Sequence, residues 1–149
     1  GFADRIRVQD IWAVPIPDGM DAKSAGPLFC GGITVFAPFV DYDLKPTDRV
    51  AVIGIGGLGH LALQFARAWG CEVTAFTTSM DKEDELKELG AHHVANSKDS
   101  DAMEKLKGKF DFILSTVNVR GGGQADGDSG VFSYRWRQVR RGVRYRIAR

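Results

Sequence analysis

Three glycines at a fixed spacing are the residues of this chain best suited to holding a phosphate. Gly54, Gly56 and Gly59 form a Gly-x-Gly-x-x-Gly pattern. In a strand–turn–helix unit the first glycine permits a tight turn, the second leaves room for a pyrophosphate, and the third lets the helix pack close to the sheet. The helix N-terminus adds unpaired N–H groups and a partial positive charge. We predict that a dinucleotide binds at Gly54, Gly56, Gly57, Leu58 and Gly59.

The flanking residues supply the strand and the helix that this chemistry needs. Residues 50–53 are an unbroken apolar run, which is typical of a parallel strand buried on both faces. Apolar residues then recur at helical spacing over residues 58–69, and Gly70 follows as a helix stop. Residues 73–76 predict a second strand. This context disfavours the alternative, a glycine-rich turn in some other α/β protein.

The alternation of strand and helix continues to about residue 119. Further strands are predicted at residues 93–95 and 110–116, with charged helical stretches between them. This order predicts an α/β fold with a partial doubly wound parallel sheet, Rossmann-like, of four strands. A complete dinucleotide-binding fold has six strands, so we expect the fourth strand to be a bare hydrophobic edge.

Changes in composition divide the chain into three parts. Residues 1–20 contain a short alternating strand at 6–8 and a connector with two prolines, which we interpret as the end of a preceding catalytic domain. Residues 21–119 hold the partial dinucleotide-binding domain and its linking helices. Residues 120–149 contain eight Arg and two Asp without a periodic apolar face. We predict that this Gly- and Arg-rich tail is disordered or unrelated to the rest.

The composition restricts the class of protein. The chain has 149 residues, of which 44% are hydrophobic and 26% charged, and its net charge is +1. It has no apolar run of transmembrane length, and its two cysteines do not make a disulfide framework. We therefore expect a cytoplasmic protein with no membrane partner. Because the chain starts with Gly rather than Met, we also expect it to be a fragment of a longer protein.

The residues after the second strand favour one dinucleotide over another. NAD sites place a carboxylate there for the ribose hydroxyls, whereas this chain has Thr77, Thr78 and Ser79, with no acid before Asp81. Hydroxyl groups can donate to a 2′-phosphate that a carboxylate would repel, and Lys82 adds a cation. The sequence predicts NADP, held by Thr77, Thr78, Ser79 and Lys82. The alternative is that Ser79 or Asp81 caps the next helix and that Lys82 is a solvated charge.

Two long stretches resemble a known family. Residues 26–36 (GPLFCGGITVF) and 52–62 (VIGIGGLGHLA) are similar to the zinc-dependent medium-chain alcohol dehydrogenases. Within that family they resemble the cinnamyl-alcohol-dehydrogenase-like branch, which includes NADP-dependent aldehyde reductases. Residues 89–93 and 110–117 agree with the same pattern, so the resemblance covers about residues 1–119.

The resemblance implies a reaction and further site residues. It implies hydride transfer between NADP(H) and a small-molecule aldehyde or primary alcohol, with zinc as a Lewis acid. It makes Cys30 a ligand of the catalytic zinc, where the alternative is a buried cysteine acting as a small hydrophobe. It also assigns Thr34, Thr116 and Val117 to the cofactor, although Thr34 fits a packed helix equally well. A homodimer is implied for the longer parent protein.

Several alternatives stay open beside this reading. Catalytic zinc needs three protein ligands and Cys30 is one, so we expect the chain by itself to be inactive. It is then an oxidoreductase fragment, a dinucleotide-binding fragment without a reaction, or a zinc-free quinone-reductase-like relative, against which Cys30 in its Gly-rich setting argues. Arg residues interleaved with aromatics at 134–149 are suited to nucleic acid. A shifted reading frame or fused junction explains that tail better, so nucleic acid is not an expected partner.

Overall fold

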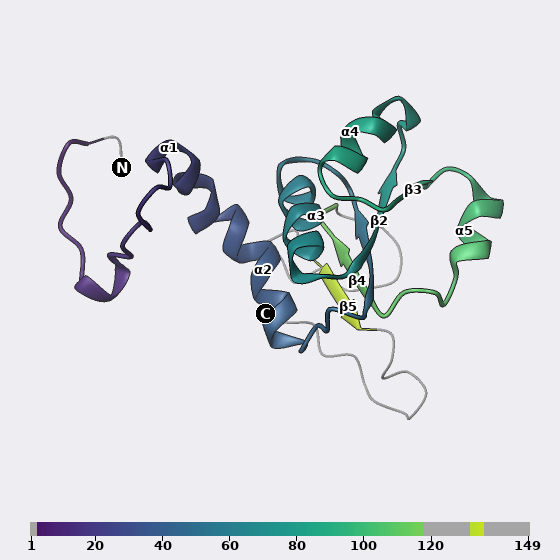
Figure 1. Cartoon of the computed structure of the whole chain (residues 1–149), viewed down its shortest axis with the longest axis horizontal. Helices are drawn as coiled ribbons and strands as arrows, with labels where there is room; N and C mark the ends of the chain where they lie inside the picture. The colour runs from purple at the N-terminus through teal and green to yellow at the C-terminus, as the bar shows by residue number, and fades with distance from the viewer. Residues whose placement is uncertain (1–2, 118–131, 136–149) are drawn as a thin grey trace.

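A five-stranded sheet lies at the centre of the structure, with the strand order β3-β2-β1-β4-β5 (Figure 1). The structure is a computed structural model that describes residues 3–117 and 132–135. The strands are β1 (Arg49–Ile53), β2 (Glu72–Thr77), β3 (His93–Asn96), β4 (Phe112–Ser115) and β5 (Phe132–Arg135). The helices are α1 (Ala22–Ala25), α2 (Gly31–Asp41), α3 (Gly57–Trp69), α4 (Glu83–Glu88) and α5 (Ser100–Leu106), with 3-10 turns η1 (Asp10–Trp12), η2 (Gly26–Phe29) and η3 (Met80–Lys82).

The first four strands run parallel, as the sequence predicts. β1 pairs with β2 on one side and with β4 on the other, and β2 pairs with β3. In this register the partners of Val52 are Ala75 and Leu114. A helix lies in each connection from β1 through β4, which confirms the predicted α/β, Rossmann-like sheet for these strands.

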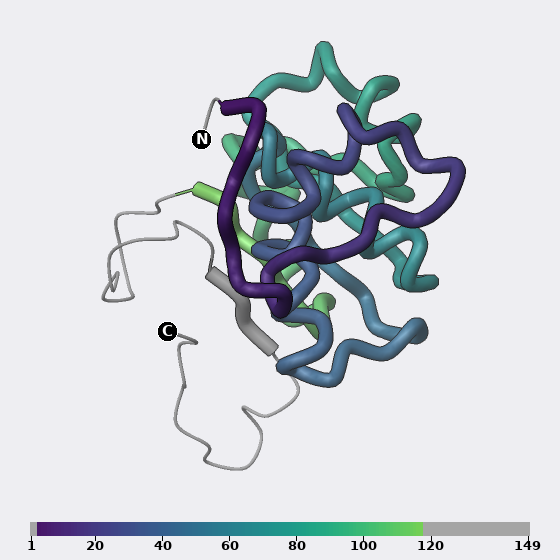
Figure 2. Tube along the Cα trace, turned by 90° about the vertical axis from the view of Figure 1, so that its left-hand side faces the viewer, coloured from purple at the N-terminus to yellow at the C-terminus, as the bar shows by residue number. Residues whose placement is uncertain are grey.

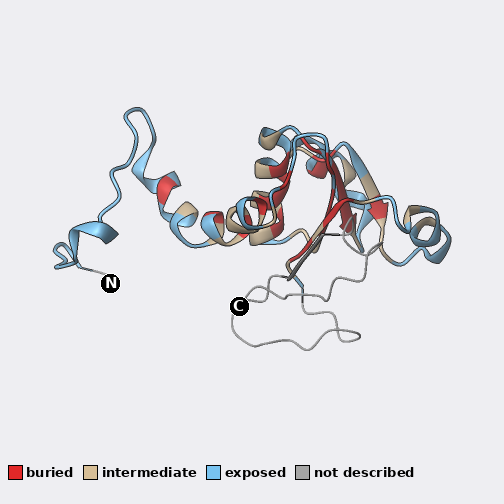
Figure 3. Ribbon diagram, turned by 90° about the horizontal axis from the view of Figure 1, so that it is seen from below, coloured by how far each residue is buried: buried red, intermediate tan, exposed pale blue. Residues whose placement is uncertain are grey.

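Alternate strand residues enter two apolar clusters, one on each face of the sheet. Val50 and Val52 are fully buried in the cluster that also contains the core residues of α2 and α3. Ala51 belongs to the opposite cluster, where Leu106 of α5 packs. Figure 3 shows the buried residues gathered in the sheet and along the helices that cover it. Cover on both faces is the reason why these strands read as continuous apolar runs.

Phe39 joins α2 to the rest of the core. Its fully buried ring has its centroid 5.9 Å from that of Phe112 in β4 and 6.5 Å from that of Trp69 in α3.

No single helix among the described residues is long and apolar enough to cross a membrane. Ala22–Phe29 and Gly31–Asp41 meet that criterion, by length and composition alone, only when they are joined across a 54° bend.

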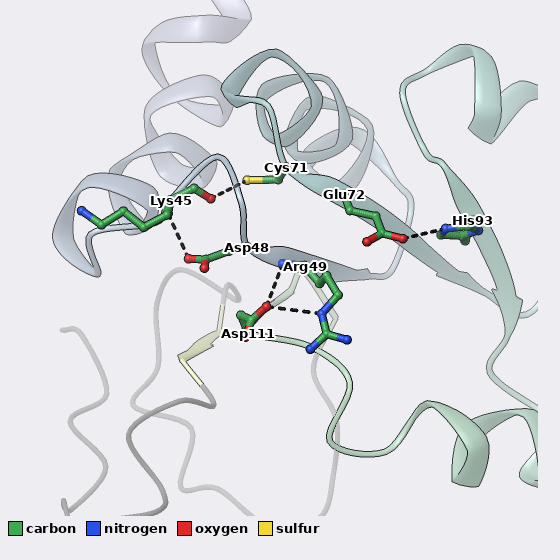
Figure 4. Close-up of polar contacts among 7 residues, drawn as sticks. All are labelled: Lys45, Asp48, Arg49, Cys71, Glu72, His93 and Asp111. Carbon is green, nitrogen blue, oxygen red and sulfur yellow. Dashed lines mark hydrogen bonds and ion pairs between the residues drawn. The ribbon is translucent and has the colours of Figure 1, made fainter.

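Polar contacts join the amino ends of the strands (Figure 4). The carboxylate of Asp111 accepts hydrogen bonds from the backbone N–H of Arg49 at 3.0 Å and from its guanidinium Nε at 3.4 Å. Asp48 accepts from the N–H of Lys45 at 2.9 Å, and the Cys71 thiol donates to the Lys45 carbonyl at 3.3 Å. Burial and the nearby Asp48 carboxylate raise the pKa of Cys71 to about 11. The amino ends are therefore occupied by contacts within the protein.

Two predictions from the sequence are wrong. β4 is not a bare edge, because β5 pairs antiparallel with all four of its residues and supplies partners for its N–H and C=O groups. Residues 6–8 form no strand, because no strand pairs with them within the described part of the chain. They belong to an exposed N-terminal arm, residues 3–20, which extends away from the sheet in Figure 1 and faces the viewer in Figure 2. Apart from β5, residues 120–149 lie outside the described residues.

Candidate dinucleotide-binding site

The chain turns sharply between β1 and α3, and two glycines permit the turn. Gly54 has a φ of +85°, which side chains rarely adopt, and a Cβ there would lie 2.3 Å from Cγ1 of Val117. At Gly59, in the first turn of α3, a Cβ would lie 2.1 Å from the carbonyl oxygen of Gly54. The helix therefore lies closer to the end of β1 than any residue with a side chain would allow.

Gly56 and Gly57 leave open space at the N-terminus of α3. Both are exposed, and apart from adjacent residues and the backbone of α3 itself no heavy atom of the described chain lies within 4 Å of a Cβ built at either position. Gly56 is the N-cap residue, and no side chain caps this 13-residue helix. The first N–H groups of α3 are therefore available to an anion. The N–H of His60 donates to the Gly56 carbonyl oxygen at 3.0 Å, and the ring Nδ1 lies 3.2 Å from that oxygen.

The carboxyl ends of β1 and β4 meet beside this turn. Because β1 has β2 on one side and β4 on the other, the strand order reverses here, which is where open α/β sheets bind ligands. Thr116, directly after β4, donates its N–H to the Ile53 carbonyl at 2.9 Å, and its hydroxyl lies 2.5 Å from the Gly54 carbonyl oxygen. Val117 covers Gly54 and is 40% exposed. The structure thus brings the predicted site residues after β4 to the glycine turn.

The predicted 2′-phosphate residues lie at the end of β2 and just beyond it, at the same end of the sheet. The hydroxyl of Thr77 donates to the Ser79 carbonyl at 3.2 Å and accepts from the Ser79 N–H at 3.1 Å, so this side chain fixes the turn. Thr78, Ser79 and Lys82 are exposed. Ser79 precedes η3 without making a side-chain cap, so the capping alternative for Ser79 is not seen. Two hydroxyls and one ammonium group are therefore presented to solvent beyond β2.

The sequence pattern did not predict a role for Ser97, which lies one residue beyond β3. Its N–H and its hydroxyl both donate to the Thr77 carbonyl, at 2.8 Å and 3.2 Å. These bonds join the ends of β2 and β3 just before the predicted phosphate-binding residues. This contact depends on the pairing of β2 with β3. The spacing along the sequence therefore holds no signal for it.

Cys30 and Thr34 lie at the start of α2. Cys30 is the exposed N-cap residue, so its interpretation as a buried hydrophobe is wrong. Thr34 is half-buried and donates its N–H to the Cys30 carbonyl at 3.0 Å. A Cβ at the adjacent Gly31 would lie 3.2 Å from the side chain of Leu61 and 3.3 Å from that of Leu58. This end of α2 therefore packs on the first turns of α3, near the glycine turn.

One thiol does not make a metal centre. Among the described residues, no three His, Cys, Asp or Glu side chains are grouped so that they could hold a metal ion. A catalytic zinc takes three protein ligands and keeps one open position. The side chains of residues 3–117 therefore do not by themselves form a complete zinc site.

Known proteins are similar to this chain in sequence and in fold. Residues 57–122 match a family model described as zinc-binding dehydrogenase. Over 120 residues the chain is 62% identical to the aldehyde reductase AdhA of Synechocystis sp., a match that covers 80% of this chain and 36% of that protein. The chain therefore spans about a third of the length of that curated relative.

Solved structures of cinnamyl alcohol dehydrogenases are also similar to this chain in fold and sequence. A cinnamyl alcohol dehydrogenase from Sorghum bicolor superposes with a TM-score of 0.66 at 38% identity, over 74% of this chain and 31% of that one. A cinnamyl alcohol dehydrogenase from Helicobacter pylori, solved in complex with NADP(H), superposes with a TM-score of 0.59 at 30% identity, over 66% and 27% of the two chains.

Proposed function

The chain belongs to the zinc-binding dehydrogenase family, and from that premise we propose that it is the NADP(H)-binding part of an oxidoreductase for aldehydes and primary alcohols. The glycine turn is the observation that carries the proposal. A side chain at Gly54 or Gly59 would clash with the protein. Gly56 and Gly57 instead have open space beside them, at a helix N-terminus that no side chain caps. A pyrophosphate needs such an approach to the backbone, at such a reversal of strand order.

The residues beyond β2 support NADP(H) rather than NAD(H). A 2′-phosphate carries negative charge, and here it would meet the exposed side chains of Thr78, Ser79 and Lys82. We propose a different role for Thr77 from the one predicted, because both hydrogen bonds of its hydroxyl go to the Ser79 backbone. We assign Thr78, Ser79 and Lys82 to the phosphate and Thr77 to the shape of the turn.

The bound cofactor supplies the hydride chemistry, and the residues of this chain hold and orient it. The first N–H groups of α3 would bind the pyrophosphate, next to the turn where the ends of β1 and β4 meet. Cys30 would contribute one thiolate to a zinc ion whose other ligands are not among the described residues. A small aldehyde or alcohol as substrate, a homodimer and a cytoplasmic location belong to the same proposal, the last supported by two cysteines that form no disulfide.

The cofactor assignment is tested by thermal melts of the full chain with NADPH and with NADH. A ligand that binds only the folded state stabilises it by about 2.7 kcal/mol at 100 times its Kd, so we expect a larger rise in Tm with NADPH. Lys82→Ala should remove most of that difference. Lys109→Ala, an exposed lysine before β4 at the opposite end of the sheet, is the matched control. Equal shifts with both dinucleotides would refute the NADP assignment, and no shift with either would refute a dinucleotide site.

The reaction is tested with a chimera, because the chain spans about a third of its relative. Residues 3–117 replace the matching segment of the Synechocystis aldehyde reductase, and NADPH oxidation is followed with an aldehyde present. We expect turnover that depends on the aldehyde. A chimera that binds NADPH but does not oxidise it would count against the proposed reaction and leave the binding site intact.

A further inference from the structure

We propose that Thr116 is a positioning residue that sets the shape of the pyrophosphate turn through the Gly54 peptide. This inference rests on the proposed function, because it concerns how the same turn receives the cofactor. The Thr116 hydroxyl lies 2.5 Å from the Gly54 carbonyl oxygen and 3.3 Å from that of Ile53. A hydroxyl has one proton to donate, and here that proton is directed at backbone carbonyls. Thr116 therefore has no proton left to donate to a phosphate.

The Gly54 carbonyl is held from two sides. Thr116 donates to it from the end of β4, while Gly59 of α3 approaches it so closely that a Cβ would lie 2.1 Å from the oxygen. A glycine backbone has access to a wide range of conformations, so Gly54 by itself does not determine where its carbonyl points. The hydrogen bond from Thr116 selects one orientation. That orientation directs the following residues toward the open N-terminus of α3.

Thr116 is itself fixed by its neighbours. Its N–H donates to the Ile53 carbonyl at 2.9 Å, which extends the pairing of β1 with β4 by one residue. The buried Ser115 hydroxyl donates to the Val117 carbonyl at 3.2 Å, and the Val117 side chain covers Gly54. Residues 115–117 thus form a short hydrogen-bonded segment across the point where the strand order reverses. A change at Thr116 should act on the turn before it acts on β2.

The test compares two probes that occupy different parts of the proposed site. NADPH uses both the pyrophosphate turn and the 2′-phosphate residues, whereas 2′-AMP uses the 2′-phosphate residues without a pyrophosphate. Thr116→Val removes the hydroxyl at nearly constant volume, and Thr116→Ser keeps it. By calorimetry on the full chain, we expect Thr116→Val to weaken NADPH binding by about three- to tenfold, the worth of one hydrogen bond. Binding of 2′-AMP should change less than about twofold, and Thr116→Ser should bind both probes like the parent chain.

Each outcome decides the matter. Unchanged NADPH binding by Thr116→Val, or an equal loss for NADPH and 2′-AMP, would overturn the positioning role while the parent chain still binds both. A parent chain that binds neither probe would overturn the proposed function and this inference with it. If Thr116→Val has no cooperative melt, Thr116→Cys takes its place, since its thiol is a weaker donor. A loss confined to NADPH is expected there too, and its absence would count against the role.

Discussion

Replacing Gly59 with alanine should force α3 away from the end of β1. The new Cβ would lie 2.1 Å from the carbonyl oxygen of Gly54 and 3.0 Å from its carbon. Real Cβ atoms essentially never approach a heavy atom within 3.0 Å, so the contact must open by about 1 Å. Both clashing atoms belong to the backbone, and the Thr116 hydroxyl donates a hydrogen bond to the same oxygen. A side-chain rotation cannot relieve the clash, and the helix has to move.

The expected loss of folding stability depends on the buried side chains that α3 contributes to the core. Overpacking costs about 1–3 kcal/mol, and we expect about 3 kcal/mol because Ala62, Leu63 and Ala66 of α3 are fully buried and would move with the helix. At about 4 °C per kcal/mol for a domain of this size, Tm should fall by about 12 °C. Thermal unfolding followed by circular dichroism measures this directly.

Gly56→Ala is the matched control for Gly59→Ala. No heavy atom of the described chain lies near a Cβ at Gly56, and its φ of −107° suits any residue. Tm should therefore change by less than about 4 °C, which corresponds to about 1 kcal/mol. The added methyl group occupies the room that the pyrophosphate needs, so NADPH binding should weaken at least about tenfold. An unchanged Tm for Gly59→Ala would refute the packing argument. Full NADPH affinity in Gly56→Ala would show that the ligand does not use this space.

Three contacts away from the glycine turn test the rest of the structure. Phe39→Ala should cost about 3–5 kcal/mol in urea denaturation, because the lost ring is fully buried. Asp99→Ala should cost about 1 kcal/mol, since its carboxylate caps α5, without affecting NADPH binding. Partial desolvation, followed by the Arg67 charge, lowers the pKa of the largely exposed His92, whose Nδ1 accepts from the Val73 N–H at 3.0 Å. The unfolded state then binds the proton more readily, so stability should fall slightly as the pH drops below about 6.5, the ordinary pKa of histidine. His92→Asn should flatten that fall.

Each of these expectations has a contrary outcome. A loss below about 1 kcal/mol for Phe39→Ala would mean that α2 is not docked on the core. Weaker NADPH binding by Asp99→Ala would place α5 at the ligand site. An equally steep loss of stability in His92→Asn would assign the acid sensitivity to other groups.

The features that could be predicted from the sequence are those set by residues close together in the chain. Apolar runs and helix-stopping glycines located β1 to β4, and the spacing of Gly54 and Gly59 located the turn. Contacts between distant residues left no such signal. Thr116 and Gly54 are 62 positions apart, and Ser97 and Thr77 are 20 apart, so their hydrogen bonds follow from the pairing of strands.

The two errors have related causes. Residues 6–8 alternate like a strand, but alternation without a partner does not make a ladder. β5 has four residues and pairs with a strand reached only after a long connection. Local pattern in the chain could not place it against β4.

The rate at which the buried Cys71 thiol is alkylated can report how often this fold opens. Thiolates react with alkylating reagents and thiols do not, and at neutral pH the Cys71 thiol remains protonated as well as shielded. Cys30 is exposed and meets the reagent at once. Cys71 reacts only after the start of β2 has separated from the loop at Lys45, which breaks the hydrogen bond from the Cys71 thiol to the Lys45 carbonyl. The slow phase of labelling would therefore time how often the native sheet opens at its amino end, without a probe having to be introduced.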